Sequence, residues 1–138
     1  MNIRKKALVF ALVFSVVLLA LFSSGCYTGK ATIKEWLDTE KGKDYVEELK
    51  KSVPDENVPE FNFYAEANHV VVAEYVCKPG VTMDAEKINS VVEEMKFEYQ
   101  RSILEFMDEN DVEEYYILIR YKSSDGKIMG ERLITRSN

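Results

Sequence analysis

Apolar residues recur along this chain with two different periods, and each period predicts a different kind of element. Between residues 82 and 107 they return every three or four positions, which is the spacing of one face of an α-helix. Either Thr82 or Asp84 can cap such a helix at its N-terminus. The apolar positions are Ile88, Val91, Val92, Met95, Tyr99, Ile103 and Phe106. We therefore expect one long helix whose apolar side faces the protein core.

A second, shorter helical region precedes it, between residues 32 and 51. Thr32 and Glu35 have the spacing of a capping box, in which each side chain bonds the backbone of the other residue. Asp38-Thr39 then breaks or restarts the helix. The apolar side consists of Ile33, Trp36, Leu37, Tyr45, Val46 and Leu49. Because a large aromatic residue contributes mostly through burial, we interpret Trp36 as a core residue and not as a ligand-stacking one.

Four segments have the period of two, or the β-branched composition, that is typical of strands. They cover residues 61–66, 69–76, 115–122 and 127–135. Ala67-Asn68 supplies a tight turn between the first two segments, and Ser124-Asp125-Gly126 joins the last two. Asp-Gly between apolar runs is a strong hairpin signal, because this turn needs positive φ angles. The segments are therefore expected to form two hairpins.

The order helix, hairpin, long helix, hairpin predicts an α+β fold (α-β-β-α-β-β) in a single domain over residues 32–138. The long helix returns the chain, so the third strand should run in the same sense as the second. We expect a four-stranded antiparallel sheet with the helices packed on one face and solvent on the other. Two strand orders satisfy this expectation, 2-1-3-4 and 1-2-4-3.

The first 26 residues follow neither period. A basic start at residues 4–6 is followed by an uncharged apolar run over residues 7–22, and the segment closes with Ser23-Ser24-Gly25-Cys26. Charged, apolar and small-residue regions in this order are the plan of a secretory signal. The apolar run is shorter than the roughly 20 residues that a membrane-spanning helix needs. An uncleaved anchor helix is the alternative interpretation.

Small residues directly before a cysteine resemble the end of bacterial lipoprotein signals. The resemblance implies that residues 1–25 are a signal peptide cleaved between Gly25 and Cys26, and that Cys26 then carries diacylglyceryl and palmitate lipid. It also implies a location at the cell membrane, on its extracytoplasmic face, because lipid chains anchor a protein without spanning the bilayer. Residues 26–31 would form a short tether between the membrane lipid and the domain.

The chain is acidic, with 24 Asp and Glu residues against 18 Lys and Arg residues and a net charge of −6. This balance disfavours nucleic-acid binding, which depends on basic patches. With Cys26 bound to lipid, Cys77 has no cysteine partner in the chain, and we interpret it as a small buried apolar residue. His69 is the only histidine and has no neighbours at metal-ligand spacing, so we interpret it as a solvated turn residue.

Residues 108–114 form an acidic run at the end of the long helix. A divalent-cation site is the sharper hypothesis, but the run lacks the residue order and the glycine of an EF-hand loop, so we interpret it as a solvated loop. The sequence also has no Gly-rich phosphate loop, no Cys/His or Ser/His pair with recognisable context and no cluster of metal ligands. We therefore expect no catalytic residue, no metal and no cofactor.

Four stretches of the chain have a more specific character: Asp38-Thr39-Glu40 and residues 64–68, 70–75 and 117–126. Together with the Glu-rich long helix between the hairpins, they resemble a family of small lipoproteins from Gram-positive bacteria whose common domain has no assigned function. The resemblance covers residues 31–135 and its motifs are structural. It implies a Gram-positive cell surface and supplies no activity.

The leading functional hypothesis is a membrane-anchored, non-catalytic binding or interaction module. It would present the open face of the sheet, or the acidic run, to an envelope or extracellular protein. One alternative is an inhibitor-like module that acts on an extracellular enzyme. A less favoured alternative is a small hydrolase with paired carboxylates, because a domain of this size has little room for a deep cleft.

Overall fold

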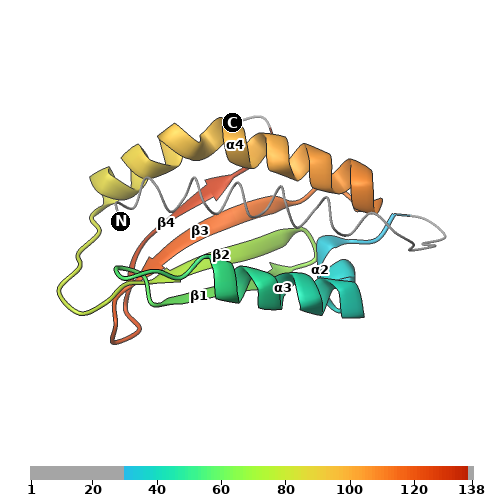
Figure 1. Cartoon of the computed structure of the whole chain (residues 1–138). Coiled ribbons are helices and arrows are strands. Elements are labelled where there is room, and N and C mark those ends of the chain that lie inside the picture. Colours follow the sequence, from blue (N-terminus) through green and yellow to red (C-terminus); the bar gives the residue numbers. More distant parts are fainter. Residues whose placement is uncertain (1–29, 137–138) are drawn as a thin grey trace.

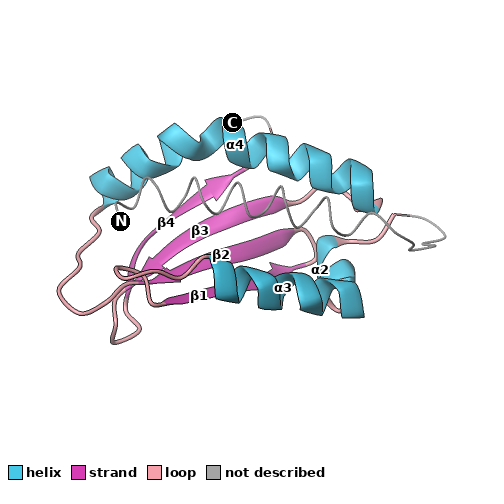
Figure 2. Cartoon of the chain, in the orientation of Figure 1, coloured by secondary structure: helices cyan, strands magenta, loops and turns pink. Residues whose placement is uncertain are grey.

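The computed structural model describes residues 30–136. The elements are α2 (Ile33–Leu37), α3 (Glu40–Ser52), β1 (Glu60–Ala67), β2 (Val70–Val76), α4 (Ala85–Asn110), β3 (Tyr116–Lys122) and β4 (Ile128–Ile134). The helices lie on one side of a single four-stranded sheet, with α3 packed over β1 and α4 packed over β4 (Figures 1 and 2). The predicted signal peptide, its cleavage site and Cys26 lie outside the described residues, and so does most of the predicted tether.

Each helix begins at the side chain that caps it. Thr32 Oγ1 accepts the backbone N–H of Glu35 at 3.1 Å, and Asp84 Oδ1 accepts that of Lys87 at 2.8 Å. The predicted break between the two short helices is confirmed, because Thr39 caps α3 in the same way. The long helix was also predicted correctly, and all seven positions of its apolar stripe are buried.

Gly42 allows α3 to begin directly against the end of α2. A Cβ atom at this position would lie 2.3 Å from the carbonyl oxygen of Trp36 and 2.5 Å from the Cα atom of Leu37. Both neighbours are backbone atoms, which cannot move aside as a side chain can. A residue that is unfavourable inside a helix is therefore required by the close approach of two backbones.

The sheet is mixed, so the prediction of a fully antiparallel sheet is wrong. The strand order is β1-β2-β3-β4, and neither 2-1-3-4 nor 1-2-4-3 occurs. β2 pairs with β3 in parallel, from Val70 opposite Tyr116 to Val76 opposite Lys122. The predicted direction of the third strand was right, but α4 is long enough to act as a crossover helix, which lets the two strands that it connects lie side by side. The two hairpins are antiparallel, as predicted.

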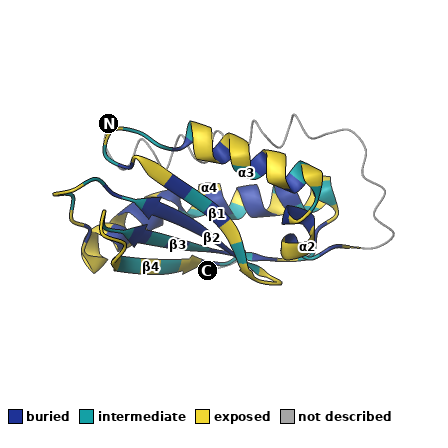
Figure 3. Ribbon diagram, turned by 90° about the horizontal axis from the view of Figure 1, so that it is seen from below, coloured by how far each residue is buried: buried dark blue, intermediate teal, exposed yellow. Residues whose placement is uncertain are grey.

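Aromatic side chains dominate the core between the sheet and the helices. The ring of Trp36 packs edge-on against those of Phe106 and Tyr45, with distances between ring centroids of 4.7 Å and 5.6 Å. Tyr75 stacks on Tyr121, and the hydroxyl of Tyr75 is hydrogen-bonded to that of Tyr99 on α4 at 3.1 Å. In Figure 3 the central strands and the inner sides of the helices are buried. The predictions of a buried Trp36 and a buried Cys77 are confirmed.

Candidate interaction surface on the open face of the sheet

Side chains on the face of the sheet away from the helices form rows that run across all four strands. Side chains alternate between the two faces along a strand, so the register places those between the core positions on the open face. One row, which we call the polar row, consists of Asn62, Glu74, Arg120 and Glu131. The next row, which we call the apolar row, consists of Tyr64, Val72, Leu118 and Leu133.

Glu74 lies at the centre of the polar row and is only 5% exposed. Its carboxylate lies 3.2 Å from Lys122 Nζ and accepts hydrogen bonds from Asn62 Nδ2 and the hydroxyl of Tyr64, each at 3.2 Å. Burial by itself would raise the pKa of Glu74, but the bonds from Lys122 and Asn62 outweigh it and hold the pKa below its ordinary value. The carboxylate is therefore ionised at neutral pH.

Arg120 connects Glu74 to the neighbouring strands. Its guanidinium donates to Glu131 at 2.6 Å and to Glu66 at 3.4 Å, and it lies 3.8 Å from the Glu74 carboxylate. It also donates to the hydroxyl of Tyr64 at 2.9 Å. That hydroxyl accepts from Arg120 and donates to Glu74, so its proton and its lone pair both have a fixed direction. Burial and the charge of Glu74 raise the pKa of Tyr64, which keeps this proton in place.

The apolar row is exposed at both ends. Tyr64 on β1 is 39% exposed and Leu133 on β4 is 42% exposed, whereas Val72 between them is fully buried. Ile128, on the open side of β4, is also exposed. A solvated sheet face usually carries polar residues, so the exposed apolar side chains beside the charged row make this face a candidate interaction surface.

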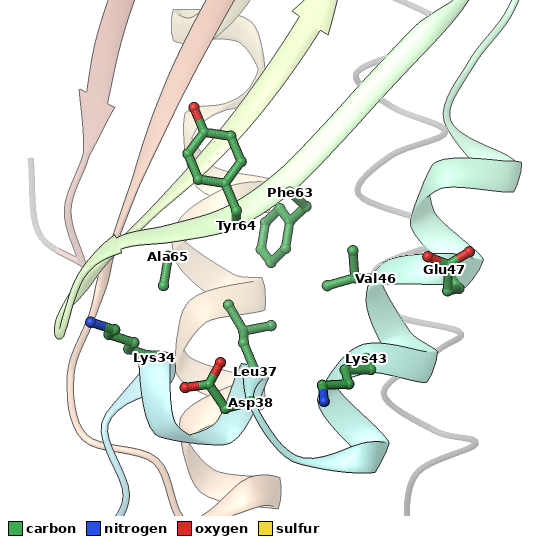
Figure 4. Close-up of a pocket in the computed structure, with 9 residues that line it drawn as sticks. All are labelled: Lys34, Leu37, Asp38, Lys43, Val46, Glu47, Phe63, Tyr64 and Ala65. Carbon is green, nitrogen blue, oxygen red and sulfur yellow. The ribbon is translucent and has the colours of Figure 1, made fainter.

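A groove lies at the β1 edge of the sheet, on the helix side, between β1 and the corner of α2 and α3. Its volume is about 330 Å³. Figure 4 shows Leu37, Val46 and Phe63 turned toward one another in the groove, while the ring of Tyr64 points away from them. The charged residues at its border are Lys34, Asp38, Lys43 and Glu47. Their charges balance, so the groove has no single charge with which to select a ligand.

The two sites considered from the sequence lie elsewhere. His69 is exposed at the hairpin turn, as predicted, with Nδ1 at 3.8 Å from a carboxylate oxygen of Glu113. Asp108, Glu109 and Asp111 in the acidic run are exposed, so the prediction of a solvated run is confirmed. The prediction of a loop is wrong for its first part, because α4 extends to Asn110 and Asp111 is its C-cap. Among residues 30–136, no three His, Cys, Asp or Glu side chains form a group that could hold a metal ion.

Sequence reasoning missed the pair Glu74 and Arg120. The available signal was one charged residue inside each of two strands that are otherwise mostly apolar, but nothing local showed that the two residues face each other. Comparisons of the chain with protein-family models, curated proteins and solved structures found no match. Within residues 30–136 no helix is both long and apolar enough to cross a bilayer.

Proposed function

We propose that this chain is a bacterial surface lipoprotein whose domain acts as a non-catalytic binding module through the open face of its sheet. The observation that supports this function best is the apolar row, which crosses the whole sheet and ends in the exposed side chains of Tyr64 and Leu133. An apolar centre bordered by polar groups is the common anatomy of a protein–protein interface.

The anchor of the proposed lipoprotein is Cys26, after cleavage behind Gly25. The support is the order of a basic start, an apolar run and small residues before the cysteine. Two or more lipid chains on this residue would hold the domain firmly at the extracytoplasmic face of the cell membrane. We also propose membership of the Gram-positive lipoprotein family that the sequence resembles.

The charges on the open face favour binding over hydrolysis. A glycosidase needs one carboxylic acid with a raised pKa to protonate the leaving group. Glu74 has a lowered pKa, and Glu66 and Glu131 both bond to Arg120. All three carboxylates lie against cations, which is an arrangement suited to recognition.

The partner should be a protein with an apolar patch and at least one basic group. Three carboxylates, those of Glu66, Glu74 and Glu131, face the two cations Arg120 and Lys122, so this part of the face has one excess negative charge. The partner's apolar patch would cover the apolar row, where buried contacts contribute most to affinity. Its basic group would approach Glu131 or Glu66, which are the more exposed carboxylates.

Site-specific photo-crosslinking in intact bacterial membranes tests the binding surface. A photo-reactive phenylalanine analogue replaces Tyr116, which lies on the open face, or Lys50, which is exposed on α3. We expect a discrete crosslinked product from position 116 only, and we expect Leu118→Asp to abolish it. Equal products from both positions, or a product that survives Leu118→Asp, would contradict the proposal. A secreted enzyme that loses activity in the captured complex would show the inhibitor function.

Intact mass of the protein extracted from membranes tests the anchor separately. We expect loss of residues 1–25 and a gain of lipid mass, both absent in a Cys26→Ala variant. An uncleaved chain would instead indicate that the apolar run 7–22 is a permanent anchor helix.

A further inference from the structure

The outer side of α4 has an apolar stripe that makes no contribution to the core. Phe97 is 79% exposed and Leu104 is 46% exposed. They are seven positions apart, so they lie on the same side of the helix, separated by about 10 Å along its axis. The core-facing stripe on the other side of α4 is already complete, with Tyr99, Ile103 and Phe106 buried.

Acidic residues outnumber basic ones along the helix that carries Phe97 and Leu104, although Arg101 lies between these two side chains. The exposed or half-exposed charged residues along this helix are Glu86, Lys87, Glu93, Glu94, Lys96, Glu98, Arg101, Glu105, Asp108 and Glu109. Two of the acids are balanced by specific partners, since Arg101 donates to Glu105 at 2.8 Å and Arg132 bonds to Glu93. Counted together, seven acids on α4 stand against its three bases and Arg132 of β4, so the two exposed apolar side chains lie on a helix with a net negative charge.

We propose that the outer side of α4 binds a cationic amphipathic helix of a partner protein. The apolar side of that helix would cover Phe97 and Leu104, and its lysines and arginines would face the surrounding carboxylates. A helix that lays its apolar side on a prepared surface is a common mode of peptide recognition, and opposite charges fix its orientation and speed its association. Asp84 caps α4, and the inner side of this helix is buried in the core, so the helix is rigid before a partner binds.

Charge argues against the other occupants of this surface. A second copy of the chain would bring the same acidic residues against each other, and an anionic bilayer would be repelled in the same way. A basic partner is the one for which both the apolar stripe and the charges are favourable.

The surface lies on the helix layer, away from the open face of the sheet (Figures 1 and 3). One molecule can therefore bind partners on both surfaces together, and each surface can be lost without the other. The inference does not depend on the proposed role of the open face.

Fluorescence anisotropy with a synthetic peptide tests the proposal. The probe is a labelled peptide of 18 residues, built only from leucine and lysine in amphipathic helical order. The full-length protein is held in nanodiscs of zwitterionic lipid, and empty nanodiscs give the background. A peptide with the same composition in scrambled order is the matched control for charge alone.

We expect the ordered peptide to bind and the scrambled one to bind at least about tenfold more weakly. Phe97→Asp should weaken binding by about tenfold or more, Leu104→Asp should act in the same direction, and Glu98→Lys should reduce binding most strongly at low salt. Leu133→Asp, on the open face, should leave it unchanged. The proposal would be overturned if the Phe97→Asp and Leu104→Asp variants bound the ordered peptide as tightly as the unsubstituted protein does. It would also be overturned if the scrambled peptide bound as tightly as the ordered one. A loss of peptide binding in the Leu133→Asp variant, without a loss in the Phe97→Asp and Leu104→Asp variants, would also overturn it.

Discussion

The two faces of β2 are both buried, but by different means. Val71, Ala73 and Tyr75 point toward the helices and pack among aromatic side chains, whereas Val72 and Glu74 lie on the open face. On the open face, neighbouring side chains of the sheet cover these two residues, and the Glu74 carboxylate is bonded to several of them. A closed apolar core fixes the fold, whereas a surface network can also exchange contacts with a partner. We therefore expect stability to depend mainly on the first face and binding mainly on the second.

The largest expected effect is on the helix-covered face. Trp36→Ala should lower the free energy of unfolding by about 3–5 kcal/mol, because Trp36 is 1% exposed and its removal leaves a cavity beside Phe106 and Tyr45. Denaturant unfolding monitored by circular dichroism measures the change. Phe97→Ala is the matched control, since it removes an exposed aromatic side chain and should change stability by less than about 0.5 kcal/mol. Equal losses of stability from both substitutions would contradict the expectation that stability depends mainly on the buried side chains of the core.

Among the charged residues of the open face, Glu74→Ala should have the largest effect on stability. It removes the anion that pairs with Lys122 and Arg120, and it leaves the hydroxyl proton of Tyr64 without its acceptor. A partly buried, charge-assisted network of this kind should cost about 1–3 kcal/mol when one member is deleted. Thermal unfolding of Glu74→Ala beside Glu74→Gln separates the charge from the hydrogen bonds. A loss below about 0.5 kcal/mol would mean that the network serves recognition alone.

Much of this fold could be predicted from the sequence, and the missing part has a physical reason. Periods of 3.6 and 2 are local properties, so the helix stripe from Ile88 to Phe106 and both hairpins could be placed correctly. The choice of neighbours in the sheet depends on contacts between distant segments, which no local period encodes. The error in the order of β2 and β3 therefore also concealed the pairing of Glu74 with Arg120, which exists only in the parallel register.

Gly42→Ala tests the corner of α2 and α3 on the helix-covered side. Alanine is favoured over glycine inside a helix by about 1 kcal/mol. The new Cβ atom would however meet backbone atoms of Trp36 and Leu37 far inside contact distance. Strain of this kind costs about 1–3 kcal/mol, so we expect a net loss of about 1 kcal/mol in denaturant unfolding. A more stable variant would show that the corner can open without cost.

Acid should weaken the open face before the core. The pKa of Glu74 is lowered in the folded protein, so its contribution to stability is complete above its unfolded pKa of about 4.3 and is lost as the pH falls through the lower folded value. We expect the melting temperature to drop between pH 5 and pH 3, and to drop less for Glu74→Gln, which cannot lose this charge. Parallel pH profiles for the two proteins would assign the acid sensitivity to other carboxylates.

The smallest effect on stability should come from the apolar row, although we expect a large effect on binding there. Leu133→Ala removes a side chain from a residue that is 42% exposed, so it should change the free energy of unfolding by about 0.5 kcal/mol or less. The same substitution at Leu49, which is fully buried against the helix-covered face, should cost about 2–5 kcal/mol. For the photo-crosslinked product at position 116 we expect the opposite order, with a larger loss for Leu133→Ala than for Leu49→Ala. The reason is that Leu49 is fully buried and cannot contact a partner. If Leu133→Ala leaves that product unchanged, the apolar row is part of the fold and the partner binds elsewhere.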